Sequence, residues 1–83
     1  MAMHSREHLN AGDAVIIDCT HQCNVMVMDD ANYHRYRRGD RVQFYGGGYR
    51  RLPAVIGVPS SGYWNVVLEA PAGARYGMRL RRR

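Results

Sequence analysis

The sequence predicts an all-β (mainly β) domain, a compact antiparallel β-sandwich or partly closed barrel of roughly six to seven short strands. Two observations lead to this prediction. Short apolar runs rich in Val and Ile are each bounded by turn residues such as Gly, Pro, Asp, Asn and Ser. Within several of these segments the side chains alternate with a period of two, as strands with one buried face do.

The first two expected strands are residues 14–19 and 23–28, and residues 20–22 are expected to join them as a tight hairpin. Val25 and Val27 of the second run alternate with more polar or flexible side chains. We therefore expect those two valines to share the buried face of this strand.

Residues 29–38 are expected to hold one short helical segment of one or two turns. Asp29 and Asp30 suit the N-cap and the first turn, where carboxylates meet free N–H groups and the positive end of the helix dipole. Basic residues suit the last turn and glycine the position after it, as in the run Arg37, Arg38 and Gly39.

Further short strands are expected at residues 42–45, 52–58 and 63–69. The glycine run 46–48 is expected to end the first of them as a hairpin or bulge. Trp64 lies in an alternating segment, which predicts that its side chain is part of the core.

The last expected strand begins near Arg75 and alternates cleanly. Its apolar face consists of Tyr76, Met78 and Leu80, and its basic face of Arg75, Arg79 and Arg81. This pattern is typical of a strand that covers a core on one side and meets water on the other.

The length of 83 residues is enough for a single domain over 1–83, with 1–8 and 81–83 expected to be mobile ends. Hydrophobic residues make up 46% of the chain, which argues against disorder. No run approaches the ~18 apolar residues of a membrane span, and the start lacks the apolar core of a secretory signal. We therefore expect a cytoplasmic protein without a membrane partner.

The net charge is +5, and all 12 cationic residues are Arg. Most of the excess lies in residues 35–51, where Arg alternates with Tyr and Phe, and in residues 79–83. The use of Arg in place of Lys also arises from a GC-rich genome. The alternation of Arg with aromatic residues is used by single-stranded nucleic-acid binders, but it also arises when arginines reach over core aromatics into water. No RNA- or DNA-binding signature accompanies the charge.

Several segments together resemble a small bacterial family, domain-of-unknown-function family 1883. They include N-V-M-V-M-D-D-A-N-Y (24–33), Y-R-R-G (36–39), F-Y-G-G (44–47), R-L-P-A-V-I (51–56) and V-P-S-S-G-Y-W-N-V-V (58–67). Its members occur alone or fused to signalling domains such as TIR. The resemblance implies a compact β-sandwich or partly closed barrel of no established activity, and it carries over no catalytic residue. The segment after Glu69 is shorter here than the family pattern.

Cys19, His21 and Cys23 form a C-x-H-x-C pattern. A structural zinc site needs four ligands, and a fourth would have to come from His4, His8 or His34. A Cys19–Cys23 disulfide is conceivable across the turn, although a cytoplasmic setting disfavours it. We expect free, largely buried thiols, no metal and no cofactor.

The candidate binding surface joins the polar 29–38 segment to the glycine-rich turn and one further tyrosine. Its residues are Asp29, Asp30, Asn32, Tyr36, Arg37, Arg38, Tyr45, Gly46, Gly47 and Tyr63. The acidic members do not match a calcium loop, and the glycines do not match a phosphate-binding loop. Helix capping and turn chemistry account for them without a ligand.

We expect a non-enzymatic recognition or adaptor module, because the sequence shows no catalytic arrangement and a domain of this size rarely encloses a substrate. It would bind an unknown ligand or protein partner through its polar loops, as a monomer or weak homodimer. The alternatives are an Arg/Tyr-rich single-stranded nucleic-acid (polyanion) binding protein and a structural or self-assembling module.

Overall fold

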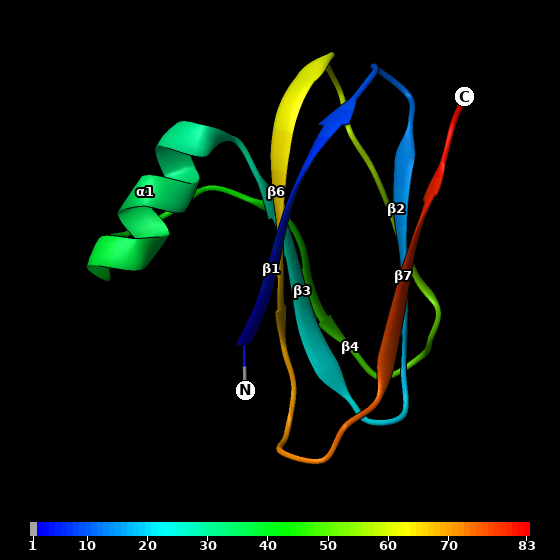
Figure 1. Cartoon of the computed structure of the whole chain (residues 1–83). Helices are drawn as coiled ribbons and strands as arrows, with labels where there is room; N and C mark the ends of the chain where they lie inside the picture. The colour runs from blue at the N-terminus through cyan, green and yellow to red at the C-terminus, as the bar shows by residue number, and fades with distance from the viewer. Residues whose placement is uncertain (1) are drawn as a thin grey trace.

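The computed structural model describes residues 2–83. Its strands are β1 (Ala2–Leu9), β2 (Ala14–Cys19), β3 (Cys23–Met28), β4 (Tyr45–Tyr49), β5 (Ala54–Gly57), β6 (Gly62–Glu69) and β7 (Tyr76–Arg81), and helix α1 (Asp30–Arg38) follows β3. The strands form two antiparallel sheets that face each other (Figure 1). The predicted all-β sandwich with one short helix in the 29–38 segment is confirmed.

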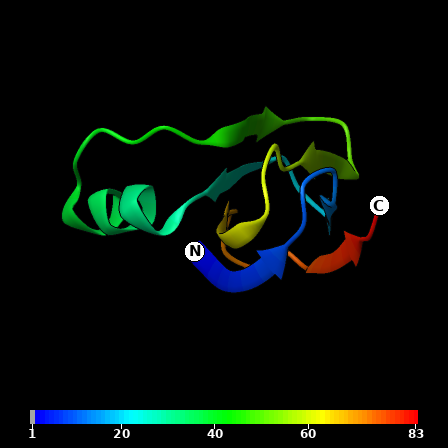
Figure 2. The same cartoon turned by 90° about the horizontal axis from the view of Figure 1, so that it is seen from above.

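The larger sheet has the strand order β1-β6-β3-β4 and the smaller has the order β5-β2-β7. Among the connections described, only the one through α1 returns to the same sheet, and each of the others crosses to the opposite sheet (Figure 2). The predicted hairpin at residues 20–22 is therefore wrong. β2 and β3 both bury one face in the shared core, so the turn passes from one sheet to the other.

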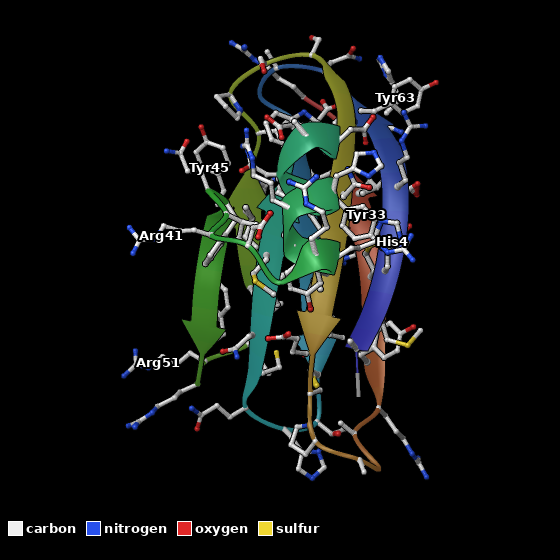
Figure 3. All side chains as sticks on the ribbon, turned by 90° about the vertical axis from the view of Figure 1, so that its left-hand side faces the viewer. His4, Tyr33, Arg41, Tyr45, Arg51 and Tyr63 are labelled. Atoms are coloured by element: carbon white, nitrogen blue, oxygen red, sulfur yellow. The ribbon has the colours of Figure 1, made fainter. Side chains whose placement is uncertain are left out.

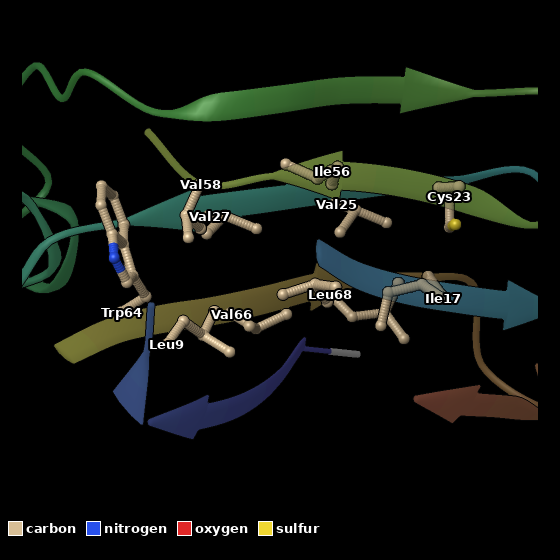
Figure 4. Close-up of a cluster of buried hydrophobic side chains, with 13 residues drawn as sticks. Leu9, Ile17, Cys23, Val25, Val27, Ile56, Val58, Trp64, Val66 and Leu68 are labelled. Carbon is tan, nitrogen blue, oxygen red and sulfur yellow. The ribbon is translucent and has the colours of Figure 1, made fainter. Parts of the chain in front are cut away.

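The core lies between the sheets and is built from alternate residues of the strands (Figure 4). Its buried side chains include Leu9, Val15, Ile17, Cys23, Val25, Val27, Ile56, Val58, Trp64, Val66 and Leu68. Trp64 is 7% exposed, so its predicted place in the core is confirmed.

Helix α1 covers the outer face of the larger sheet (Figure 1). There Tyr33 and Tyr36 pack on the buried side chains of Met26, Met28 and Val67, which point away from the core. Within residues 2–83 the one helix is nine residues long, too short to cross a bilayer.

The predicted ends of the helix are confirmed. The Asp29 carboxylate caps the first turn, and Gly39 adopts a left-handed conformation with φ 78°. The N–H groups of Gly39 and Asp40 then donate to the carbonyls of Tyr36 and Arg35, which closes the last turn.

The structure pairs or hydrogen-bonds residues of both predicted mobile ends, 1–8 and 81–83, with the rest of the sandwich. β1 is paired with β6 from Ala2 opposite Glu69 to Leu9 opposite Gly62, while residue 1 lies outside the described residues. At the other end Arg81 belongs to β7, and the two residues after it contact the buried Asp13.

The glycine run is a strand rather than the predicted turn. β4 spans Tyr45–Tyr49 and pairs with β3, whereas the expected strand at residues 42–45 is mostly irregular. Gly46 has φ +116°, and a Cβ there would overlap the carbonyl oxygen of Val25. Glycine is therefore required for β4 to approach β3 this closely.

Candidate functional site

A hollow of about 460 Å³ lies beside the N-terminus of α1. We call it the helix-cap hollow. Three segments far apart in the sequence supply its lining, which consists of Met28, Asp29, Asn32, Gln43, Phe44, Tyr45, Pro59, Ser60 and Trp64. It combines aromatic and hydrogen-bonding side chains, as ligand sites commonly do.

The polar wall of the hollow is built by helix capping. Oδ1 of Asp29 accepts hydrogen bonds from the backbone N–H of Asn32 at 2.8 Å and from its side-chain amide at 3.0 Å. Oδ1 of Asn32 in turn accepts from the backbone N–H of Gln43 at 3.0 Å. The cap thereby fastens the segment before β4 to the start of the helix.

The aromatic wall of the hollow is anchored by Trp64. Its Nε1–H donates to the carbonyl of Ser60 at 3.0 Å, and the ring of Tyr45 meets it edge-on with centroids 6.0 Å apart. Phe44 is 42% and Tyr45 48% exposed, whereas Trp64 is 7% exposed. The rings of Phe44 and Tyr45 are thus accessible, whereas the Trp64 ring is nearly buried and is held by its hydrogen bond to Ser60.

Asp30 and Tyr63, two further predicted site residues, face a different side of the helix. Arg6 of β1 forms a two-pronged ion pair with Asp30, at 3.1 and 2.8 Å, and stacks over the ring of Tyr63 at 3.9 Å from its centroid. Figure 3 shows Tyr63 and Tyr45 on opposite sides of α1. Asp30 and Tyr63 therefore do not join the helix-cap hollow.

The contacts of Asp30 attach the helix to the larger sheet. Besides Arg6, the side-chain amide of the buried Asn65 donates to its carboxylate at 2.7 Å. The hydrogen bonds from Arg6 and Asn65 lower the pKa of Asp30 to about 2. His4 completes the arrangement, because its Nε2 lies 2.8 Å from Oδ1 of Asn65 and its ring stacks on Tyr33 (Figure 3).

Tyr36, Arg37 and Arg38 lie on the second half of the helix, away from the hollow. The hydroxyl of Tyr36 donates to the carboxylate of Glu69 at 2.7 Å, and this bond, together with burial, raises the pKa of Tyr36 to about 12. Arg38 pairs with Asp40 at 3.0 Å. Tyr36 therefore docks the helix, and the two arginines remain on its exposed side.

Of the ten predicted site residues, the structure brings Asp29, Asn32 and Tyr45 together. Gly46 and Gly47 lie within β4, opposite Met26 and Val25 of β3, and not at a loop tip. Sequence reasoning missed the remaining members of the hollow, which are Met28, Gln43, Phe44, Pro59, Ser60 and Trp64. The adjacent aromatics Phe44 and Tyr45 were the available signal.

A comparison with protein families decides what the chain is related to. The family model described as a domain of unknown function, DUF1883, matches residues 1–80. The chain belongs to the DUF1883 family. Neither a curated protein nor a solved structure matches it. The match extends from β1 into β7, and because the DUF1883 description names no activity, function has to be argued from the site.

Cys19 and Cys23 of this DUF1883 domain are free thiols. Cys23 is buried in the core, and burial, with the neighbouring Cys19, raises the pKa of its thiol. Within residues 2–83, no three side chains of His, Cys, Asp or Glu are grouped as a metal site would require. The buried position of Cys23 is explained by packing.

The Arg- and Tyr-rich 35–51 segment is not exposed throughout in this DUF1883 domain. Tyr36 is tied to Glu69, and Tyr49 packs against the core. Arg41 and Arg51 lie at separate points along the edge of the larger sheet (Figure 3). The alternation of Arg with aromatic residues is thus divided between partly buried and exposed positions.

Proposed function

We propose that this protein is a non-catalytic recognition module that binds a small ligand in the helix-cap hollow. The observation that carries the proposal is that Asp29, Gln43 and Tyr45 line one hollow together with the indole of Trp64. A few hydrogen-bonding groups set against aromatic surface are the usual composition of a ligand site.

The charge of the lining favours a neutral or cationic ligand. Asp29 is the only lining residue that is charged at neutral pH. Both hydrogen bonds described for its carboxylate go to Oδ1, which leaves Oδ2 available to a ligand donor. The exposed rings of Phe44 and Tyr45 would pack on an apolar face or a cationic group.

The same lining supports binding rather than catalysis. It contains one carboxylate and no histidine or cysteine. Acid–base catalysis commonly uses histidine or a carboxylate pair, and a serine nucleophile needs an adjacent base. Ser60 has no such base among the residues that line the hollow with it.

A ligand screen monitored by NMR tests the proposal. The probes are tetramethylammonium, simple sugars and a single-stranded DNA oligonucleotide. We expect a cationic or neutral probe to shift the amide signals of Asn32, Gln43 and Tyr45. Tyr45→Ala should weaken that binding by about fivefold, since a ring contact contributes on the order of 1 kcal/mol.

Tyr76→Ala is the matched control, because Tyr76 is similarly exposed, at 41%, but lies on β7. Equal loss in both variants would contradict the proposal. So would binding of the oligonucleotide alone with an affinity that falls steeply with salt, which is the behaviour of a phosphate-binding surface.

A further inference from the structure

The sandwich is open between β1 and β7. β1 pairs only with β6 and β7 only with β2, so each strand has one edge without a partner among the described residues. Figure 1 shows both strands running toward the same end of the molecule. At that end the guanidinium of Arg82 donates to the carbonyl of His8 at 3.0 Å.

A hollow of about 340 Å³ lies between the first halves of β1 and β7. Core side chains of both sheets form its floor, namely Ile17, Val66 and Leu68. Its rims carry Met3 on β1 and Tyr76 on β7, which are 37% and 41% exposed. An apolar side chain that entered this gap would meet the core directly.

The rim on β7 is basic. Arg79 and, just before the strand, Arg75 flank Gly77 on the side of β7 that points away from the core. None of the ion pairs within residues 2–83 includes these two arginines. An acidic residue, Asp18, lies opposite Gly77, but it belongs to β2, which pairs with the edge of β7 away from the gap. Across the gap, Arg6 of β1 is already paired with Asp30.

We propose that an extended acidic segment of a partner protein adds as a strand along the free edge of β7. Side chains of an added strand alternate between two faces. Its apolar residues would enter the hollow over Ile17 and Leu68, while its carboxylates would lie beside Arg75 and Arg79. Main-chain hydrogen bonds to β7 would supply affinity, as in other cases of strand addition. The side chains on the two faces of the added strand would supply specificity.

Charge distinguishes this partner from a second copy of the chain. Two β7 edges paired with each other would bring rows of arginine together, and like charges on neighbouring strands are destabilising. An acidic strand reverses the sign of that interaction. The surface is separate from the helix-cap hollow, so the inference does not depend on the proposed ligand.

The test uses a fluorescent peptide of about eight alternating Glu and Val residues, a typical strand length. We expect saturable binding that weakens with salt, with NMR shifts confined to β1 and β7. Arg75→Glu combined with Arg79→Glu should weaken binding at least about tenfold and should favour a Lys–Val peptide instead. Circular dichroism checks that the variant is folded.

Arg50→Glu combined with Arg51→Glu is the matched control, since it changes the net charge equally at exposed positions next to β4. The Tyr45→Ala variant should bind the peptide normally. The proposal is overturned if both arginine pairs matter equally, or if no peptide binds. It is also overturned if a peptide with proline at alternate positions binds as tightly as the Glu–Val peptide, because proline lacks the N–H donors that strand pairing needs. A dimer with protected β7 amides would identify a second copy as the occupant.

Discussion

The carboxylate of Asp13 accepts a hydrogen bond of 2.8 Å from the backbone N–H of Arg83, the last residue of the chain. It also accepts from the backbone N–H of Asn10 at 2.8 Å and from the guanidinium of Arg82 at 3.1 Å. The Asp13 side chain is 2% exposed. One buried carboxylate therefore joins the turn after β1 to the segment after β7.

Replacing Asp13 should change how stability depends on pH. The hydrogen bonds from Arg83 and Asn10 hold the pKa of Asp13 below its usual value of 3.8. Its contribution is therefore present above that value and is lost as the pH falls below it. Asp13→Asn should be less stable than the parent at neutral pH, and urea unfolding should show the difference shrinking in acid. Asp18→Asn, at an exposed aspartate of β2, should show a smaller difference.

Gly46→Ala should destabilise the protein more than Gly48→Ala. Gly46 has φ +116°, and an added Cβ would overlap the Val25 carbonyl, whereas at Gly48 the nearest atom is the movable Oδ1 of Asn24 at 3.2 Å. We expect a difference of about 2 kcal/mol or more in the free energy of unfolding. Chemical denaturation measures it, and equal costs would contradict the assigned register of β4 on β3.

Trp64→Ala should leave the protein largely unfolded. Truncating a buried Trp costs ~3–5 kcal/mol, and a domain of this size has on the order of 5 kcal/mol in total. Trp64→Phe keeps most of the volume but loses the hydrogen bond to Ser60, so it should cost about 2 kcal/mol. A cooperative unfolding curve for Trp64→Ala that matches the parent would show that this side chain is not part of the core.

Tyr36→Phe tests how α1 is held on the sheet. Loss of the bond to Glu69 should cost about 1 kcal/mol at neutral pH. Because the pKa of Tyr36 is raised from 10.0 to about 12, its contribution is complete below pH 10 and disappears as the pH rises between these values. The stability of parent and variant should therefore converge in alkali, while a gap that persists there would argue against the assigned bond.

The two cysteines should differ in reactivity, and chelators should have no effect. A thiol reagent should modify the half-buried Cys19 before Cys23, whose pKa is raised by burial. Cys23→Ser should cost about 1–3 kcal/mol, because it places a hydroxyl in the core. The melting midpoint should be unchanged in a metal chelator. About one zinc per chain, lost with the fold on Cys19→Ser, would show instead that the pair binds metal.

The alternating strands could be predicted because each has one face in the core. Val25 and Val27 of β3 and Trp64 of β6 stand out by this period. β1 could not be predicted in the same way, since only Leu9 among its residues is fully buried. Its outer residues His4 and Arg6 are polar because they bond to Asn65 and Asp30 beneath and beside the helix.

The candidate site was predictable only where its chemistry is local. Asp29 and Asn32 are three positions apart and belong to one helix cap, so the sequence places them together. Ser60 and Trp64 join them because β6 and β4 both lie beside β3. That pairing depends on the approach of Gly46 to Val25, which no local pattern specifies.

The strand order also has a consequence for how the chain folds. β1 pairs with β6, from Ala2 opposite Glu69, and β2 pairs with β7, from Ala14 opposite Arg81. Both of these pairings join the start of the chain to its end, and closing such long loops precedes any gain from the contacts. During synthesis β2 first meets a partner when β5 emerges, and its other edge stays unpaired until β7 leaves the ribosome, so an apolar strand edge is exposed during that interval.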